Sequence, residues 1–178
     1  MKRYLILILV VAMISIPVFA QSKDYRAPGY KGSVSLTDQI GVFVGLETSH
    51  GIMFSHYHYL GVGAGAFVFP NGSDYPWFSE AFLDYQYYIL SKRSTPFAGL
   101  QVGYIQAMGH GNKVNGFDHA YSFAQGVNFK PSIGWSWAFN SGIGFTLSAG
   151  ANIILPFGSD KGTSPVVTIP KIAFALSF

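Results

Sequence analysis

The stretch IGFTLSAGANI, residues 143–153, decides the fold, because two kinds of side chain alternate along it without interruption. One set is apolar: Ile143, Phe145, Leu147, Ala149, Ala151 and Ile153. The other set is small or polar: Gly144, Thr146, Ser148, Gly150 and Asn152. Successive side chains of a strand point to opposite faces, so a period of two gives one apolar and one polar face. Such alternation over about ten residues is typical of a strand that crosses a membrane in a β-barrel.

The same alternation recurs along the rest of the chain. It is clear in residues 128–139, which the tight-turn signal Asn140-Ser141-Gly142 separates from 143–153, and again in residues 171–178. Noisier segments with the same parity are residues 57–69, 78–90 and 97–108. The first two strands are expected at residues 29–36 and 40–53, and their boundary is the least defined. The sequence therefore predicts an all-β fold, an eight-stranded antiparallel transmembrane up-and-down β-barrel.

The composition favours the same fold. Charged residues make up 11% of the chain, against ~25% in ordinary soluble domains. There is no cysteine to form the disulfides that stabilise many small exported domains. No apolar run after residue 20 is long enough for a transmembrane helix. A closed barrel is the other structure that satisfies its backbone hydrogen bonds in lipid.

The first twenty residues have the pattern of a cleaved signal peptide. Lys2 and Arg3 precede an apolar run, Pro17 ends it, and Ala20 closes a small-residue cleavage site. We therefore expect residues 1–20 to be a signal peptide and residues 21–178 to be the barrel domain; a retained anchor is the weaker alternative, because the run is too short to span a membrane. Without Lys2 and Arg3, nine basic and eight acidic residues leave a net charge of +1, which gives no basic patch for nucleic acid.

The predicted connections alternate in length. Short turns are expected at residues 55–56, 91–95 and 140–142, and longer polar loops at 70–77, 109–125 and 156–165. A short first outer turn at 37–39 would be an exception. Barrels of this kind have short periplasmic turns and long outer loops, so both termini are expected in the periplasm of a Gram-negative bacterium.

Three motifs resemble those of the small outer-membrane β-barrels of the OmpA/OmpX-like type. They are Gly29-Tyr30-Lys31-Gly32, Ser49-His50-Gly51 and Pro131-Ser132-Ile133-Gly134. The end of the chain is similar to the assembly signal of such barrels, with Phe174, Leu176 and Phe178 on alternate positions, although Ala173 stands where the family often has glycine. The resemblance implies insertion by the barrel assembly machinery of the outer membrane, and it implies no particular activity. We expect contact with outer-membrane lipid, no nucleic acid partner and a monomer.

Several charged residues fall on the inward parity of the predicted strands. They are Lys31, Glu47, Glu80, Asp84, Lys130 and Lys171. Charges in a narrow lumen must be paired or solvated, so we expect a salt-bridge network that fills the barrel. A proton or ion path is the alternative.

The sequence offers little that resembles an active site. His56 and His58 share a strand face, but no further metal ligands can be located. His119 and Ser122 would lie on opposite faces of a strand, as would Ser49 and His50. We therefore expect no catalytic residues, no metal and no cofactor, and a non-enzymatic structural or binding role carried by the outer loops. A lipid A-modifying enzyme of the outer leaflet is the alternative, and a small pore is disfavoured because eight strands leave a filled lumen.

The assignment of alternate residues to the lipid face and the lumen face can be tested with charge substitutions. We expect Leu147→Arg to impair insertion, because arginine on the lipid face at mid-membrane costs ~2–4 kcal/mol. The matched change Ser148→Arg places the charge in the lumen and should not disturb lipid contact. Single cysteines at the same two positions, in a chain with no native cysteine, should react with a lipid-phase reagent at 147 and not at 148. The opposite labelling would invert the assigned faces.

Overall fold

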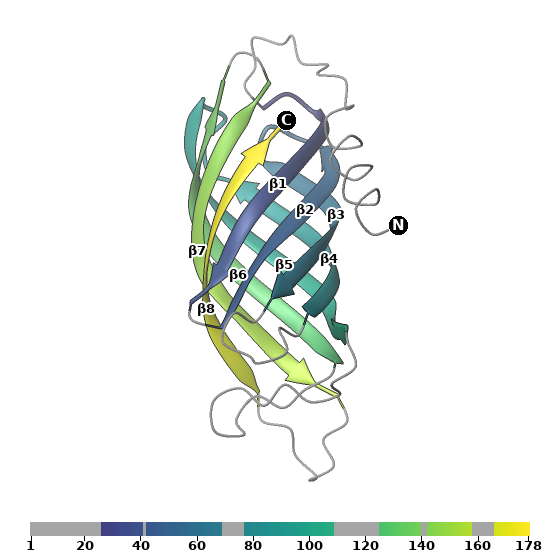
Figure 1. Cartoon of the computed structure of the whole chain (residues 1–178). Helices are drawn as coiled ribbons and strands as arrows, with labels where there is room; N and C mark the ends of the chain where they lie inside the picture. Colours follow the sequence, from purple (N-terminus) through teal and green to yellow (C-terminus); the bar gives the residue numbers. More distant parts are fainter. Residues whose placement is uncertain (1–25, 41, 69–76, 109–124, 140–141, 158–165) are drawn as a thin grey trace, which may run out of the picture.

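The computed structural model describes residues 26–40, 42–68, 77–108, 125–139, 142–157 and 166–178. They form a single closed barrel (Figure 1). Its strands are β1 (Gly29–Gln39), β2 (Phe43–Met53), β3 (His58–Val68), β4 (Trp77–Tyr88), β5 (Ser94–Met108), β6 (Gln125–Ala138), β7 (Gly144–Pro156) and β8 (Val167–Ser177). Each strand pairs antiparallel with the next, and β8 pairs antiparallel with β1. The predicted eight-stranded antiparallel barrel is confirmed.

The two ends of the barrel differ in their connections. At one end lie the short connections 54–57, 89–93 and 139–143, together with Gly29 and the C-terminus (top of Figure 1); we call this the turn end. At the other end, the loop end, strands β1, β3, β5 and β7 end at Gln39, Val68, Met108 and Pro156, and the next strands begin at Phe43, Trp77, Gln125 and Val167. This alternation agrees with the predicted one. Most residues of the long connections, and residues 1–25 with the expected signal peptide, lie outside the described ranges. Within those ranges, no helix is long and apolar enough to span a membrane.

The boundary between the first two strands differs from the prediction. The turn expected at residues 37–39 is instead strand, and the chain reverses at residues 40–42. Thr37 and Gln39 continue the inward parity of β1 and are completely buried. The turn is fixed by a hydrogen bond from the Val42 amide to the Gln39 carbonyl, 2.8 Å. Polar side chains that suggest a turn in the sequence are here used to fill the lumen.

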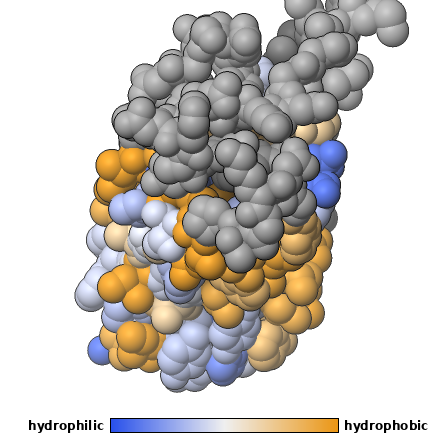
Figure 2. All heavy atoms as spheres, turned by 90° about the horizontal axis from the view of Figure 1, so that it is seen from below, coloured by the Kyte–Doolittle hydropathy of each residue, from blue (hydrophilic) through white to orange (hydrophobic). Residues whose placement is uncertain are grey.

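The outward face is apolar along most of the barrel. Apolar side chains gather on its flank in the space-filling view (Figure 2). Leu147 is 50% exposed on this face, whereas its neighbour Ser148 lines the interior. Large exposed apolar residues on every strand share the outward parity; examples are Leu36, Leu46, Val62, Leu83, Leu100, Ile133, Leu147 and Phe174. An apolar surface of this extent is typical of a membrane-facing or interface surface.

The last residue takes part in closing the barrel. The Gly32 amide donates to the Phe178 carbonyl at 2.7 Å, and the Phe178 amide donates back to the Gly32 carbonyl at 2.9 Å. The Phe178 ring occupies the space that a side chain at position 32 would need, since a Cβ there would lie 2.5 Å from Phe178 Cε2. The ring also lies edge-on to His50, with centroids 6.3 Å apart. Phe178 therefore extends the seam between β1 and β8 by one residue pair.

Deletion of Phe178 should reduce the folded fraction. The deletion removes both backbone hydrogen bonds to Gly32 and the ring that covers it. The measurement is the share of unboiled protein that migrates as the compact form on a gel after assembly in cells. The matched control is Phe178→Tyr, which keeps the ring and the backbone pair and should assemble normally. Normal assembly of the deletion variant would contradict the role assigned to this residue.

Candidate functional site

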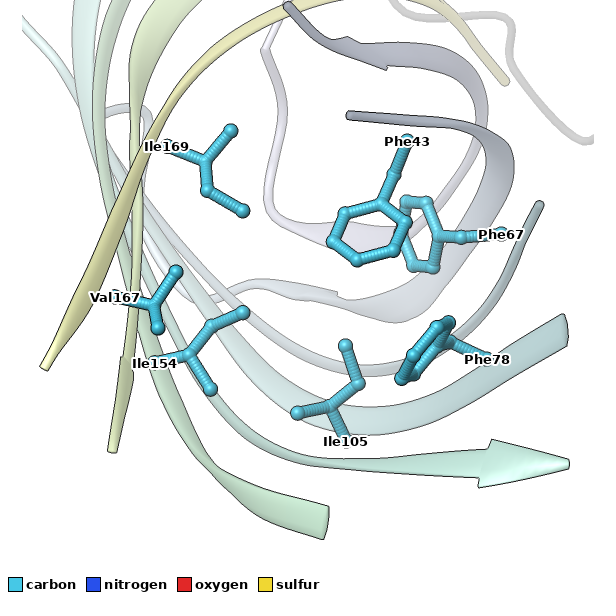
Figure 3. Packing of buried hydrophobic residues seen from close by; sticks show 7 residues of the cluster. All are labelled: Phe43, Phe67, Phe78, Ile105, Ile154, Val167 and Ile169. Carbon is cyan, nitrogen blue, oxygen red and sulfur yellow. The ribbon is translucent and has the colours of Figure 1, made fainter. Parts of the chain in front are cut away.

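The lumen gathers the buried charged residues of this barrel, and it is layered along its axis. At the loop end it is closed by an apolar plug, drawn in Figure 3. The plug consists of Phe43, Phe67, Phe78, Ile105, Ile154, Val167 and Ile169, all buried. The Phe43 and Phe78 rings pack edge to face with their centroids 5.0 Å apart. Side chains from β2 to β5 and from β7 and β8 pack together in this layer.

An ion cluster lies next to the plug. Lys130, 1% exposed, pairs with Glu80 and with Glu47, the latter at 3.1 Å from Nζ to Oε1. Lys171 donates to both oxygens of Glu47, at 2.8 and 3.0 Å. The Asn128 amide donates to the second Glu80 oxygen at 2.9 Å. Two carboxylates and two ammonium groups neutralise one another, which is how buried charges are normally tolerated.

The other two predicted lumen charges lie in a separate group nearer the turn end. Lys31 donates to the Tyr88 hydroxyl, and its ammonium lies 4.5 Å from the centroid of the Tyr88 ring. Asp84 accepts a hydrogen bond from Gln86 Nε2 at 3.0 Å. Gln86 Oε1 lies 3.4 Å from the Lys31 ammonium, so this glutamine connects the two charges. The six inward charges thus form two groups rather than one continuous network.

A small polar chamber separates the two groups. Its volume is about 60 Å³. Hydroxyl groups from four strands line it, together with Asp84, Glu47 and Lys171: Ser33, Ser35, Ser49, Ser132, Thr146 and Ser148. A buried water needs ~10–15 Å³, so the chamber has room for roughly four waters. Ligand sites usually measure ~300 Å³ or more. The chamber therefore suits hydration of the lumen charges and not a substrate.

Arg26 closes the turn end, a role that sequence reasoning missed. Its guanidinium lies 4.3 Å from the Tyr88 ring centroid and donates to the carbonyl and the hydroxyl of Ser136, each at 3.3 Å. Arg26 Nε donates to the carbonyl of Lys92, also at 3.3 Å. Burial lowers the pKa of Arg26 below its ordinary value. The one signal in the sequence was a basic residue placed just before the first strand, at the end where the inward tyrosines lie.

In the described part of the chain, no histidine ring bonds a serine hydroxyl, whereas His50 Nε2 bonds the Thr48 hydroxyl at 2.9 Å. No group of three metal-ligating side chains occurs in the described part of the chain. Ser49 points inward to the Tyr59 hydroxyl at 2.8 Å, whereas His50 points outward to the Tyr30 hydroxyl at 2.6 Å, so the two lie on opposite faces as predicted. His58 bonds the Tyr85 hydroxyl at 2.8 Å. Residues of the longest loop, His110, Asp118, His119 and Ser122, lie outside the described ranges.

Comparison with known proteins identifies the fold. No protein-family model and no curated protein sequence matches the chain. Among solved structures it is similar to Neisserial surface protein A, with a TM-score of 0.55 and 10% identity over 83% of this chain and 92% of that one. A weaker likeness is to the N-terminal β-barrel domain of Pseudomonas aeruginosa OprF, with a TM-score of 0.49 and 9% identity over 84% of this chain and 96% of that one. Another is to the outer-membrane enzyme PagL, with a TM-score of 0.45 and 16% identity over 85% of this chain and 99% of that one. The protein has the fold of the small eight-stranded outer-membrane barrels.

Removal of Lys130 should be the most damaging change in the ion cluster. Lys130→Met leaves Glu80 without a cation and Glu47 with one, and breaking a buried pair in this way costs ~3–5 kcal/mol. Lys171→Met should cost clearly less, because both carboxylates keep Lys130. The measurement is the urea midpoint of the refolded protein in vesicles. Adding Glu80→Gln to Lys130→Met should restore part of the loss, and equal losses for the two lysine variants would contradict the central position of Lys130.

Proposed function

We propose that this protein is a non-enzymatic integral outer-membrane barrel whose structural or binding role is carried by the connections at its loop end. The single observation that supports this most directly is the filled lumen. An apolar plug, the neutral ion cluster and the Arg26–Tyr88 contact follow one another along the axis. The interior then serves stability, and any recognition falls to residues outside the lumen.

The location follows from the surface and the ends of the chain. A belt of outward apolar side chains matches a barrel seated in lipid. The signal-peptide pattern of residues 1–20 supports export. The alternate apolar residues Phe174, Leu176 and Phe178, with Phe178 paired to β1, support recognition by the barrel assembly machinery. In this orientation the turn end faces the periplasm and the loop end faces the outside.

The alternative of an outer-leaflet enzyme finds no support on the described outward face. A lipid A-modifying site would need a base and a nucleophile at the loop end. The outward histidines of the described strands do not lie at the loop end: His58 bonds the Tyr85 hydroxyl at the turn end, and His50, in the turn-end half of β2, bonds the hydroxyls of Tyr30 and Thr48. Neither has a serine beside it on that face, since Ser49 points into the lumen.

Lipid A analysis separates the two functions. We expect lipid A from cells with and without the protein to have identical masses in a mass spectrum, because no catalytic group is assigned. A lost or added acyl chain that depends on the protein, and that disappears in His119→Ala, would establish the enzyme instead. A second variant, in which a Gly/Ser linker replaces residues 109–124, should remain a heat-modifiable barrel and lose any surface binding that the parent shows.

A further inference from the structure

An exposed basic pair lies at the turn end, in the connection between β4 and β5. Lys92 and Arg93 are both exposed. Arg93 Nε donates to the Ala138 carbonyl at 3.1 Å, and its guanidinium lies 5.3 Å from the centroid of the Phe139 ring. The Ala138 amide in turn donates to the Arg93 carbonyl at 2.9 Å. These contacts fix the guanidinium and leave its two terminal nitrogens without a partner among the described residues.

Among the described residues of the turn end, no side-chain carboxylate neutralises this pair. Glu47, Glu80 and Asp84 lie in the lumen, where other groups bind them. Asp38 is the penultimate residue of β1, at the loop end. A planar guanidinium whose Nε is already bonded can donate from its two terminal nitrogens to two oxygens of one phosphate.

A continuous aromatic platform extends from Arg93 along the outward face of β6, β7 and β8. Phe139 lies 5.8 Å from Phe145, Phe145 stacks on Trp137 at 4.6 Å, and Phe145 stacks on Phe174 at 6.2 Å, all between ring centroids. Trp137 lies 6.3 Å from Trp135, whose indole donates to Ser94. Aromatic rings of this kind favour the level between headgroups and acyl chains.

We propose that Arg93 and this platform form a binding site for an anionic phospholipid of the leaflet at the turn end. The guanidinium fork binds the headgroup phosphate, and an acyl chain lies along Phe139, Phe145 and Trp137. A zwitterionic lipid fits less well, because Lys92 repels its ammonium group and no described carboxylate is near to bind it. The proposal rests on the proposed function only in requiring that the barrel spans a lipid membrane.

Tryptophan quenching by brominated lipids tests the site. The chain has three tryptophans, Trp77 at the loop end and Trp135 and Trp137 in the platform. Trp77→Phe therefore makes the emission report on the platform alone. The refolded Trp77→Phe protein is placed in vesicles that contain brominated phosphatidylglycerol or brominated phosphatidylcholine at equal mole fraction, and the relative association constant of the two lipids is obtained from the quenching.

We expect phosphatidylglycerol to bind about fivefold more strongly, the effect of roughly one basic residue at an anionic surface. Arg93→Gln should bring the ratio close to one, whereas the matched neighbour Lys92→Gln should keep most of it. Equal quenching in the parent, or equal losses in the two variants, would overturn the site. The site would also be overturned if inorganic phosphate lowered the ratio of the two association constants and chloride at the same ionic strength did not. Free phosphate would then be the ligand. Absence of quenching by either lipid would instead refute the membrane-spanning function itself.

Discussion

Closure of β8 on β1 is the constraint on which the rest of this structure depends. In lipid an unpaired strand edge leaves backbone amides and carbonyls without partners, so a sheet of this kind is stable only as a cylinder. The register of the closing pair runs from Ser33 with Ser177 to Asp38 with Ile172, and hydrogen bonds of Gly32 and Ile40 extend it at both ends. Closure also fixes the diameter, and the diameter decides what the interior can contain.

An eight-stranded barrel has an interior just wide enough for side chains to fill it. In the ion cluster, every second strand contributes one charged side chain to fill this space: Glu47 on β2, Glu80 on β4, Lys130 on β6 and Lys171 on β8. Strands β1, β3 and β7 place small residues opposite these charges, Ser35, Gly65 and Gly150, whereas β5 adds Gln101, which bonds Lys171 and Glu47. A Cβ at Gly65 of β3 would lie 2.8 Å from Glu80 Oε1, so the glycine makes room for the carboxylate. Small residues on neighbouring strands thus make room for the long charged side chains of the cluster.

This geometry explains what the sequence alone could predict. Parity is a local property, and it correctly assigned Leu147 to the outside and Ser148 to the inside. Which inward charges meet depends on how the strands are staggered around the barrel. Lys171 and Glu47 are 124 residues apart in sequence, and no local pattern shows that they touch while Lys31 and Asp84 lie in another layer. The end of β1 was misplaced for a similar reason, because Thr37 and Gln39 resemble turn residues until a lumen is present to bury them. Arg26 escaped notice because it lies outside every strand.

Buried apolar side chains pack at both ends of the lumen, and the turn end adds a cation to them. At the loop end the closure is apolar, and its residues belong to the strands themselves. At the turn end a cation supplied by the chain ahead of β1 stacks on Tyr88 and bonds β6. Between these closures every lumen charge already has a partner within the barrel. A partner molecule would have to displace a buried pair to enter, at a cost of several kcal/mol. This cost supports the proposal that recognition takes place outside the lumen.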